Sequence, residues 1–471
     1  MPAMPEVLES RNPARPDEVV GVAPVADVAG LEAEVAAARA AQADWDALGI
    51  VERGRILRRA AGELERRAED LAVLLTAEQG KTLDEARVEV GGSVETLLYH
   101  AGHARDADGA TYPSGNPDEL IRTVRVPVGL VAAITPWNFP VQIPAWKLAP
   151  ALLHGNAVLW KPSSETPMTS LALAEALVAG GLPAGVLRVL IGGGEVGRAL
   201  VAHPAVGAIT FTGSVPVGRG IAVQAAERGA KVQLELGGHS ACIVCPDVDP
   251  AWAAGIALAG AMGGTGQKCT ATRRVIAVGG ALEPLLAELR RQTPLLVVGD
   301  GATAGAQIGP LVSAGARDGV AAALAAALAE GAEVVAEAPV PAGGGWYLAP
   351  TVLQGGPDLA ICREEVFGPV AVVLAVDDLD GAIALANATD FGLTATVLTR
   401  DERVIRRCVR ELEAGIVKAN APNTGSELHV PFGGLKDSSF PAPREQNAAS
   451  AAEFFTWSKS AYLRVPPEAA L

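Results

Sequence analysis

The residue with the clearest potential for covalent chemistry is Cys269, in the segment GGTGQKCTATRR. The preceding glycines allow close backbone approach, and a helix could begin after the cysteine at Thr270. A thiol near a helix N-terminus ionises more readily, and Lys268 and Arg273 add positive charge if they point inward. A thiolate there would add to a carbonyl carbon, and the adduct could lose hydride. These local features leave open the alternative that Cys269 is a small buried hydrophobe.

Two other motifs carry weaker chemical signals. Cys242 and Cys245 form a CxxC within SACIVCPD, a segment typical of a buried strand in which residues three apart face opposite sides. No second CxxC or nearby His pair completes a zinc site, so we expect a structural role and no metal. The sequence GGGEVG (192–197) matches G-x-G-x-x-G between a strand and a helix, but the acidic residue expected about 20 positions later is missing. We expect this segment to lie near a cofactor at most.

Composition sets the scale of the protein that must position these residues. The chain has 471 residues, of which 49% are hydrophobic and 19% charged, which predicts two or three packed domains. The net charge of −15 argues against nucleic acid as a partner. The uncharged stretch 251–267 is too short and too rich in Gly and Ala for a membrane span and reads as a buried helix. The odd set of five cysteines and the absence of an apolar signal at the N-terminus predict a cytoplasmic location.

Hydrophobic periodicity predicts an α/β fold. Residues 29–100 show apolar positions three and four apart, which indicates helices, and Gly80 is a plausible C-terminal stop. From residue 129 onward short apolar strands (LVAAIT, AVLWKP, LRVLIG, AITFTG, KVQLEL) alternate with helices, which is typical of a parallel, doubly wound sheet. A second α/β set after about residue 238 includes ACIVCPDVD, RRVIAV, AVVLAV and ATVLTR, with an Ala-rich helix near 317–331.

A small β element is predicted outside these two sets. The alternating IRTVRV within 107–127 indicates an exposed antiparallel strand, and the tail SAAEFFTWSKSAYLRV reads as a short helix that leads into a strand. We expect the two segments to pair.

Seven motifs, in family order and along nearly the whole chain, resemble those of the aldehyde dehydrogenase superfamily. They are TPWNFP (135–140), WKPSSETP (160–167), FTGSVPVG (211–218), LELGGHS (234–240), GQKC (266–269), EEVFGPV (364–370) and PFGGLKDS (431–438). The resemblance implies a Rossmann-like cofactor domain (1–106 and 128–237), an α/β catalytic domain (238–437) and an oligomerisation element (107–127 and 438–471).

The resemblance also implies catalytic roles. Cys269 matches the nucleophile, and Asn138 matches the amide that forms an oxyanion hole with the Cys269 backbone N–H. Glu235 matches the base that activates water to hydrolyse a thioester. Lys147 and Glu445 match an inner pair proposed to relay protons, with a structural salt bridge as an equal alternative.

Further positions match residues that bind an NAD(P)+ cofactor. Ser214 matches a pyrophosphate ligand at a helix N-terminus, Lys161 and Glu365 match ribose ligands, and Phe367 and Trp137 match the nicotinamide end. The remaining matches are Thr135, Ser164, Gly213, Val217, Gly218, Leu236 and Gly237.

One departure bears on the choice of cofactor. Many NAD+-using relatives carry Glu three residues after the Lys of WKP, whereas this chain has Ser164 there and Glu165 one place later. Serine leaves room for a 2′-phosphate and removes a repelling charge, so we expect NADP+ or dual use; an inward Glu165 would reverse this. A second departure is His239, where Lys is usual, which we expect to be a surface exchange.

The substrate tunnel implied by the resemblance is lined by Phe139, Ile143, Trp146, Lys268, Thr270, Ser426 and Phe432. Lys268 offers a cation, and Ser426 replaces an aromatic residue common in relatives that prefer unsubstituted aldehydes. The segments around Cys269 and at the C-terminus are most similar to the 2-oxoglutarate semialdehyde branch, so we expect a carboxylate-bearing semialdehyde.

Several alternatives stay open. A medium aliphatic or aromatic aldehyde is the rival substrate, and a non-catalytic structural member and an acylating enzyme that uses coenzyme A are the rival classes. Retention of Cys269, Asn138 and Glu235 disfavours the non-catalytic class, and retention of Glu235 disfavours the acylating class. We expect a homodimer or homotetramer that binds neither nucleic acid nor a membrane.

Overall fold

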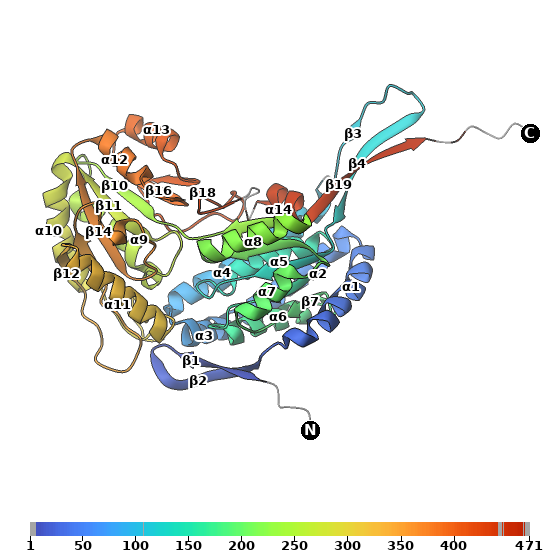
Figure 1. The fold of residues 1–471 in the computed structure, drawn as a ribbon, viewed down its shortest axis with the longest axis horizontal. Helices are drawn as coiled ribbons and strands as arrows, with labels where there is room; N and C mark the ends of the chain where they lie inside the picture. Colours follow the sequence, from blue (N-terminus) through green and yellow to red (C-terminus); the bar gives the residue numbers. More distant parts are fainter. Residues whose placement is uncertain (1–5, 107, 441–444, 446, 465, 467–471) are drawn as a thin grey trace, which may run out of the picture.

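The computed structural model describes residues 6–106, 108–440, 445, 447–464 and 466. Two parallel sheets, each covered by helices on both faces, form the body, and a narrow antiparallel arm projects from it (Figure 1). The predicted α/β fold class is confirmed. Residue 107 and parts of the predicted 438–471 segment lie outside the described residues.

The first sheet has five parallel strands in the order β7-β6-β5-β8-β9. Its strands are β5 (Leu130–Ile134), β6 (Ala157–Lys161), β7 (Leu187–Val189), β8 (Val206–Thr212) and β9 (Lys231–Glu235). Alternate residues of β5 pack into two different apolar clusters, one on each face. This double burial explains why the strands are continuous apolar runs.

Eight helices surround this sheet. They are α1 (Leu31–Ala47), α2 (Ile50–Arg66), α3 (Ala68–Gln79), α4 (Leu83–Gly102), α5 (Gln142–Leu153), α6 (Pro167–Ala179), α7 (Gly194–Ala202) and α8 (Val215–Arg228). The helices predicted within 29–100 are confirmed, and Gly80 ends α3 with a left-handed φ of 94°. Thr82 starts α4 with a capping box completed by Glu85.

The second sheet has seven strands in the order β12-β13-β14-β11-β10-β16-β17, all parallel to their neighbours except β12. Its strands are β10 (Ser240–Val244), β11 (Thr272–Val278), β12 (Glu333–Glu337), β13 (Thr351–Gln354), β14 (Val370–Val376), β16 (Thr394–Leu398) and β17 (Ile416–Ala419). Its helices are α9 (Pro250–Met262), α10 (Leu282–Gln292), α11 (Ala314–Ala329), α12 (Leu379–Asn387) and α13 (Glu402–Glu411). Cys242 and Cys245 pack into clusters on opposite sides of the sheet, as predicted.

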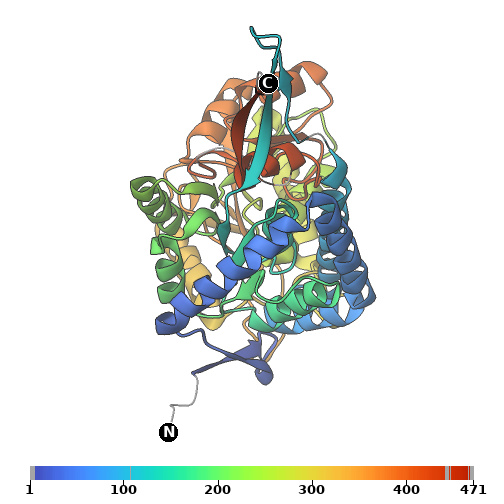
Figure 2. The same ribbon diagram turned by 90° about the vertical axis from the view of Figure 1, so that its right-hand side faces the viewer.

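The arm pairs segments from far apart in the chain. Strand β4 (Glu119–Pro127) lies between β3 (Thr111–Tyr112) and β19 (Thr456–Arg464), and all pairs are antiparallel. Helix α14 (Ala448–Phe455) leads into β19, as predicted. Figure 2 shows the arm at one end of the body and a hairpin at the other. That hairpin, β1 (Val7–Asn12) with β2 (Arg15–Pro24), was not predicted, and neither was the small pair β15 (Phe391–Gly392) and β18 (Leu435–Lys436).

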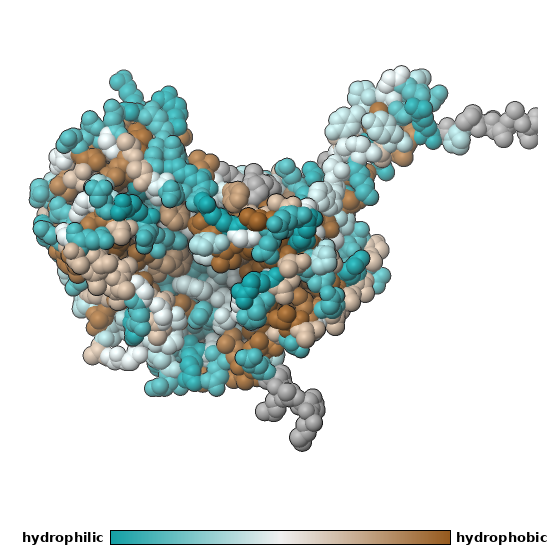
Figure 3. All heavy atoms as spheres, viewed as in Figure 1, coloured by the Kyte–Doolittle hydropathy of each residue, from teal (hydrophilic) through white to brown (hydrophobic). Residues whose placement is uncertain are grey.

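The surface mixes apolar and hydrophilic residues, and exposed apolar side chains occur on the projecting arm as well as on the body (Figure 3). Within the described residues, helices fall short of the length and apolarity that crossing a membrane would require. The stretch read as a buried helix contains α9, whose inner face packs against the second sheet.

Candidate active site

Cys269 lies in the loop between α9 and β11 rather than before a helix. The predicted helix start at Thr270 is wrong, because the chain enters β11 at Thr272. This central strand pairs with β10 and β14, so its backbone groups are committed to the sheet ladder and cannot form a helical turn.

A tight turn fixes the approach to the nucleophile. Gly264, Thr265 and Gly266 are all left-handed, with φ values of 62°, 58° and 64°. A Cβ on Gly266 would overlap the carbonyl of Gly368, so only glycine fits there. Arg273 donates to the carbonyl oxygens of Gly266 and Gly368 at 2.5 and 2.7 Å. A strained conformation held in this way by buried contacts is typical of functional sites.

The surroundings of Cys269 are acidic rather than basic. Burial, followed by the charges of Glu365 and Glu235, raises the pKa of Cys269 to about 12. The cations that were expected to oppose this do not reverse it: Lys268 Nζ lies 3.3 Å from Glu85, and Arg273, which acts electrostatically on both Cys269 and Glu365, binds carbonyl oxygens. The expectation of an easily ionised thiol is therefore wrong, and a base is needed to remove its proton.

Asn138 lies against the nucleophile loop. It follows β5, is 5% exposed, and donates from Nδ2 to the Gln267 carbonyl oxygen at 3.1 Å. An amide nitrogen carries two N–H groups, so the second one can serve an oxygen bound at Cys269.

Glu235 approaches from the other side. It is the last residue of β9 and is 3% exposed. The next turn brings the chain against the nucleophile, because a Cβ on Gly238 would overlap the carbonyl oxygen of Cys269. The structure thus brings Cys269, Asn138 and Glu235 together from separate parts of the chain.

Lys147 and Glu445 form a fully buried ion pair. Lys147 Nζ also donates to Thr210 Oγ1 at 3.0 Å, and Thr210 in turn donates to Gln233 Oε1, two residues before Glu235. The pair exists as the sequence suggested, and both a proton relay and a structural salt bridge are compatible with it.

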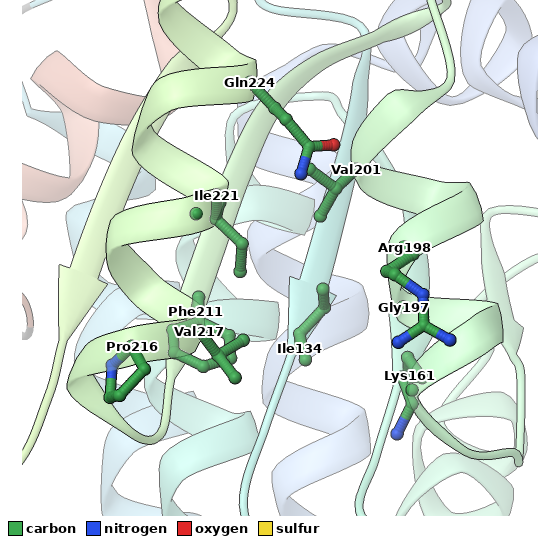
Figure 4. A pocket seen from close by; sticks show the side chains of 12 residues that line it. Ile134, Lys161, Gly197, Arg198, Val201, Phe211, Pro216, Val217, Ile221 and Gln224 are labelled. Carbon is green, nitrogen blue, oxygen red and sulfur yellow. The ribbon is translucent and has the colours of Figure 1, made fainter.

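A groove of about 400 Å³ opens at the carboxyl ends of β5, β6 and β8, between α7 and α8 (Figure 4). Open α/β sheets bind their ligands at this edge. Lys161 and Val217 line the groove, and burial lowers the pKa of Lys161, whose Nζ donates to the Pro162 carbonyl oxygen at 3.0 Å. A nicotinamide dinucleotide fits here on two grounds: the groove is walled by glycines and apolar side chains, and a buried amine faces it.

The other predicted cofactor residues surround this groove or pack beneath it. Ser214 is the N-cap of α8, and its side chain makes no capping bond. Gly213 N–H donates to the Glu235 carbonyl oxygen, and Gly218 packs on Leu236. Thr135 Oγ1 accepts from Trp160, so its hydroxyl is occupied within the core. Ser164 is partly buried, Glu165 is exposed, and neither lines the groove.

The predicted nicotinamide-end residues gather near the nucleophile. The rings of Trp137 and Phe367 meet edge to face with centroids 5.6 Å apart. Glu365 Oε1 accepts from Gly238 N–H at 2.9 Å, and a Cβ on Gly237 would overlap its carboxylate.

Two residues differ from the sequence-based account. Arg198, on α7 directly after the segment set aside as a weak fingerprint, lines the groove beside Lys161 (Figure 4). Its position one residue after GGGEVG was the available signal. His239 is 2% exposed, so the expected surface exchange is wrong; its Nε2 lies 3.1 Å from the Ile361 carbonyl oxygen, and burial lowers its pKa to about 3.

A second cavity of about 260 Å³ lies on the other side of Asn138. Asn138, Phe139 and Lys268 line it, together with Lys81 and residues of α4. Five predicted tunnel residues are not among its lining. They are Ile143, Trp146, Thr270, Ser426 and Phe432; Trp146 and Phe432 pack on each other at 5.4 Å, and Ser426 is exposed.

Comparison with known proteins gives the following relationships. The model of the aldehyde dehydrogenase family matches residues 2–461. An α-ketoglutarate semialdehyde dehydrogenase of Haloferax volcanii is 42% identical over 97% of this chain and 95% of its own. A betaine aldehyde dehydrogenase of Rhizobium leguminosarum is 40% identical over 98% and 94%. The solved structure of a methylmalonate-semialdehyde dehydrogenase, so named provisionally, from Sinorhizobium meliloti with NAD superposes with a TM-score of 0.94 at 30% identity, covering 98% and 95%.

Proposed function

This chain belongs to the aldehyde dehydrogenase family and is an NAD(P)+-dependent aldehyde dehydrogenase, and we propose that it oxidises a small semialdehyde bearing a carboxylate, through a thioester on Cys269. The observation that supports the mechanism is that Asn138 and Glu235 both approach Cys269: Asn138 donates to the carbonyl oxygen of Gln267 in the nucleophile loop, and the charge of Glu235 helps to raise the pKa of Cys269.

The chain's own groups account for the steps around the sulfur. Glu235 takes the proton of the Cys269 thiol, whose raised pKa makes a base necessary. The sulfur adds to the aldehyde carbon, and the developing oxyanion accepts from the Asn138 amide and the Cys269 backbone N–H. A nicotinamide dinucleotide in the groove supplies the hydride acceptor. Glu235 loses the thiol proton to solvent and then deprotonates a water that attacks the thioester. The C–S bond breaks, the carboxylic acid leaves, and Glu235 returns the proton taken from water to the Cys269 sulfur.

The acceptor of the acyl group is proposed to be water. Transfer to coenzyme A would not need a base for water, and Glu235 is retained and buried at the site. Assay of NADPH formation at 340 nm with and without coenzyme A separates the two reactions.

The substrate proposal rests on Lys268 and on the relatives. Of the two lysines at the cavity, Lys81 is committed to buried partners, whereas the Lys268 ammonium, packed on Gly264, forms its ion pair among the described residues with Glu85 at 3.3 Å. A substrate carboxylate can therefore recruit Lys268, in keeping with relatives named for α-ketoglutarate semialdehyde and 2,5-dioxopentanoate. A quaternary ammonium such as betaine aldehyde prefers several aromatic faces. Among the described lining residues only Phe139 is aromatic, and the Lys81 ammonium covers its ring at 4.3 Å.

Replacement of Lys268 tests this substrate class. Lys268→Met removes the cation and keeps the apolar length, so the KM for 2,5-dioxopentanoate should rise about 10- to 100-fold, the value of one charge-assisted hydrogen bond. The KM for pentanal, which has no carboxylate, should change less than twofold. Equal changes for the two aldehydes in steady-state assays would rule out Lys268 as the carboxylate ligand and favour the medium aliphatic aldehyde.

For the cofactor we favour NADP+. The groove presents the amine of Lys161 and the guanidinium of Arg198, and Ser164 puts no carboxylate beside it. Glu195 acts on Lys161 electrostatically and accepts from Gly193 N–H, which tempers the positive charge. The two cations Lys161 and Arg198 outnumber the exposed carboxylate of Glu195, so the groove still favours a cofactor with a 2′-phosphate over one with a free ribose hydroxyl.

The domains and the subunit contacts follow the same family pattern in our proposal. We propose cofactor binding by 1–106 and 128–237, catalysis by 238–437, and subunit contacts by the arm of 107–127 and 438–471, in a cytoplasmic homodimer or homotetramer. The arm exposes apolar side chains at Tyr112, Leu120, Trp457, Tyr462 and Leu463. Sedimentation velocity would refute the assembly by showing a single species with the 48.0 kDa mass of one chain.

A further inference from the structure

Asn138 can stabilise an oxyanion only if its backbone is held in place, and its segment is a loop. Residues 135–141 connect β5 to α5, and loops are the least rigid part of such a fold. Because an oxyanion donor must lie within hydrogen-bond distance of the developing charge, small displacements of this loop reduce its contribution steeply.

A buried ion pair from the segment that joins α3 to α4 and from α4 itself binds the middle and the C-terminal end of that loop. Lys81, between α3 and α4, pairs with Glu89 of α4, and the two residues are 5% and 1% exposed. Lys81 Nζ also donates to the Asn138 carbonyl oxygen at 2.7 Å. Glu89 Oε1 accepts from the backbone N–H groups of Val141 and Gln142 at 2.8 and 3.2 Å. Side chains thus replace the hydrogen bonds that regular structure would otherwise supply here.

The residues on either side of Lys81 connect it to the loop that carries the nucleophile. Leu83 N–H, two residues after Lys81, donates to the Gly301 carbonyl oxygen at 2.9 Å. The backbone of Gly80 packs so closely on Gly309 that a Cβ on Gly309 would overlap the carbonyl oxygen of Gly80. Gly309 in turn accepts from Thr265 Oγ1 at 3.1 Å, in the strained turn before Cys269. One chain of contacts therefore spans the amide donor and the nucleophile.

We propose that Lys81 and Glu89 are positioning residues that hold the Asn138 loop in register with Cys269, a role that rests on the proposed function of those two residues. The pair touches backbone atoms of the loop rather than the reacting groups, so it acts through Asn138. It is also poorly suited to bind substrate, because the Lys81 ammonium already meets Glu89, the Asn138 carbonyl and the Phe139 ring.

The test is a double-mutant cycle between Lys81 and Asn138. Lys81→Met should lower kcat about 100-fold, the value of one oxyanion donor, and should cause little further loss in an Asn138→Ala background. The rate of Cys269 alkylation by iodoacetamide should stay within about threefold, because that displacement develops no oxyanion. NADP+ binding measured by calorimetry should be unchanged. Arg87→Met, which removes an exposed cation from α4, the helix that follows Lys81 and carries Glu89, is the matched control and should leave all three measurements unchanged.

Each outcome decides a different point. Equal losses from Lys81→Met in the wild-type and Asn138→Ala backgrounds, or an unchanged kcat, would overturn the positioning role. An Asn138→Ala variant with normal kcat would instead overturn the proposed oxyanion hole. Because a single replacement leaves a buried charge unpaired and can prevent folding, the variant Lys81→Met/Glu89→Gln, which removes both charges, undergoes the same cycle.

Discussion

At the scale of single residues, the site is built around a thiol that burial keeps protonated. Glu365 and Glu235 add negative charge to the effect of burial, and Lys268 and Arg273 are occupied by other partners. A thiol of this kind is protected from adventitious oxidation and becomes a nucleophile only when a base removes its proton. In the proposed mechanism Glu235 is that base, which gives one carboxylate a part in both halves of the reaction.

The effect of Glu365 on the thiol can be measured directly. Glu365→Gln removes a negative charge, so the pKa of Cys269 should fall and the thiolate fraction at any pH below it should rise, about tenfold for each pH unit by which the pKa falls. Iodoacetamide should therefore label Cys269 several-fold faster at pH 8 in this variant, followed by mass spectrometry of the cysteine peptide. Glu364→Gln, the exposed neighbour, serves as control. Slower or unchanged labelling would show that the charge of Glu365 does not help to raise the pKa of Cys269.

At the scale of elements, periodicity predicted the strands that lie inside the sheets and missed those at the margins. β5, β6, β8 and β10 are buried on both faces and read as continuous apolar runs. The β1–β2 hairpin is mostly exposed, so its composition carries no such signal. The helix expected after Cys269 failed because strand pairing of β11 overrides local propensity.

The residues of the site divide in the same way into those that the sequence predicted and those that it missed. Positions inside motifs could be assigned by resemblance, whereas Lys81, Glu89 and Arg198 act through contacts that only the fold creates. A local hint existed for Glu89, a carboxylate four residues after Glu85 on a largely buried helix face.

Helix α7 carries the prediction on cofactor choice. Arg198→Ala should weaken NADP+ binding at least about tenfold, the loss of one charge-assisted contact, and leave NAD+ binding within twofold. Ser164→Glu should shift preference towards NAD+ by repelling a 2′-phosphate. Binding of both cofactors is measured by calorimetry, with Arg219→Ala, an exposed arginine of α8 outside the groove lining, as control. Parallel losses for the two cofactors would show that Arg198 does not read the phosphate.

At the scale of the whole molecule, the site takes its residues from both of the sheets that form the body (Figure 1). Asn138 follows β5 and Glu235 ends β9 of the five-stranded sheet, whereas Cys269 and Glu365 belong to loops of the seven-stranded one. The groove proposed for the cofactor and the cavity proposed for the aldehyde share no lining residue. In the proposed mechanism the hydride acceptor and the aldehyde therefore bind at separate places.

The most direct test is to trap the covalent intermediate. Glu235→Gln should allow acyl transfer to the sulfur at high pH, where the thiol ionises without a base, and should block hydrolysis. Rapid acid quench after mixing with 2,5-dioxopentanoate and NADP+, followed by peptide mass spectrometry, should show the acyl group on Cys269 in amounts equal to the NADPH burst. An NADPH burst without an acylated Cys269, or acylation of another residue, would contradict the account.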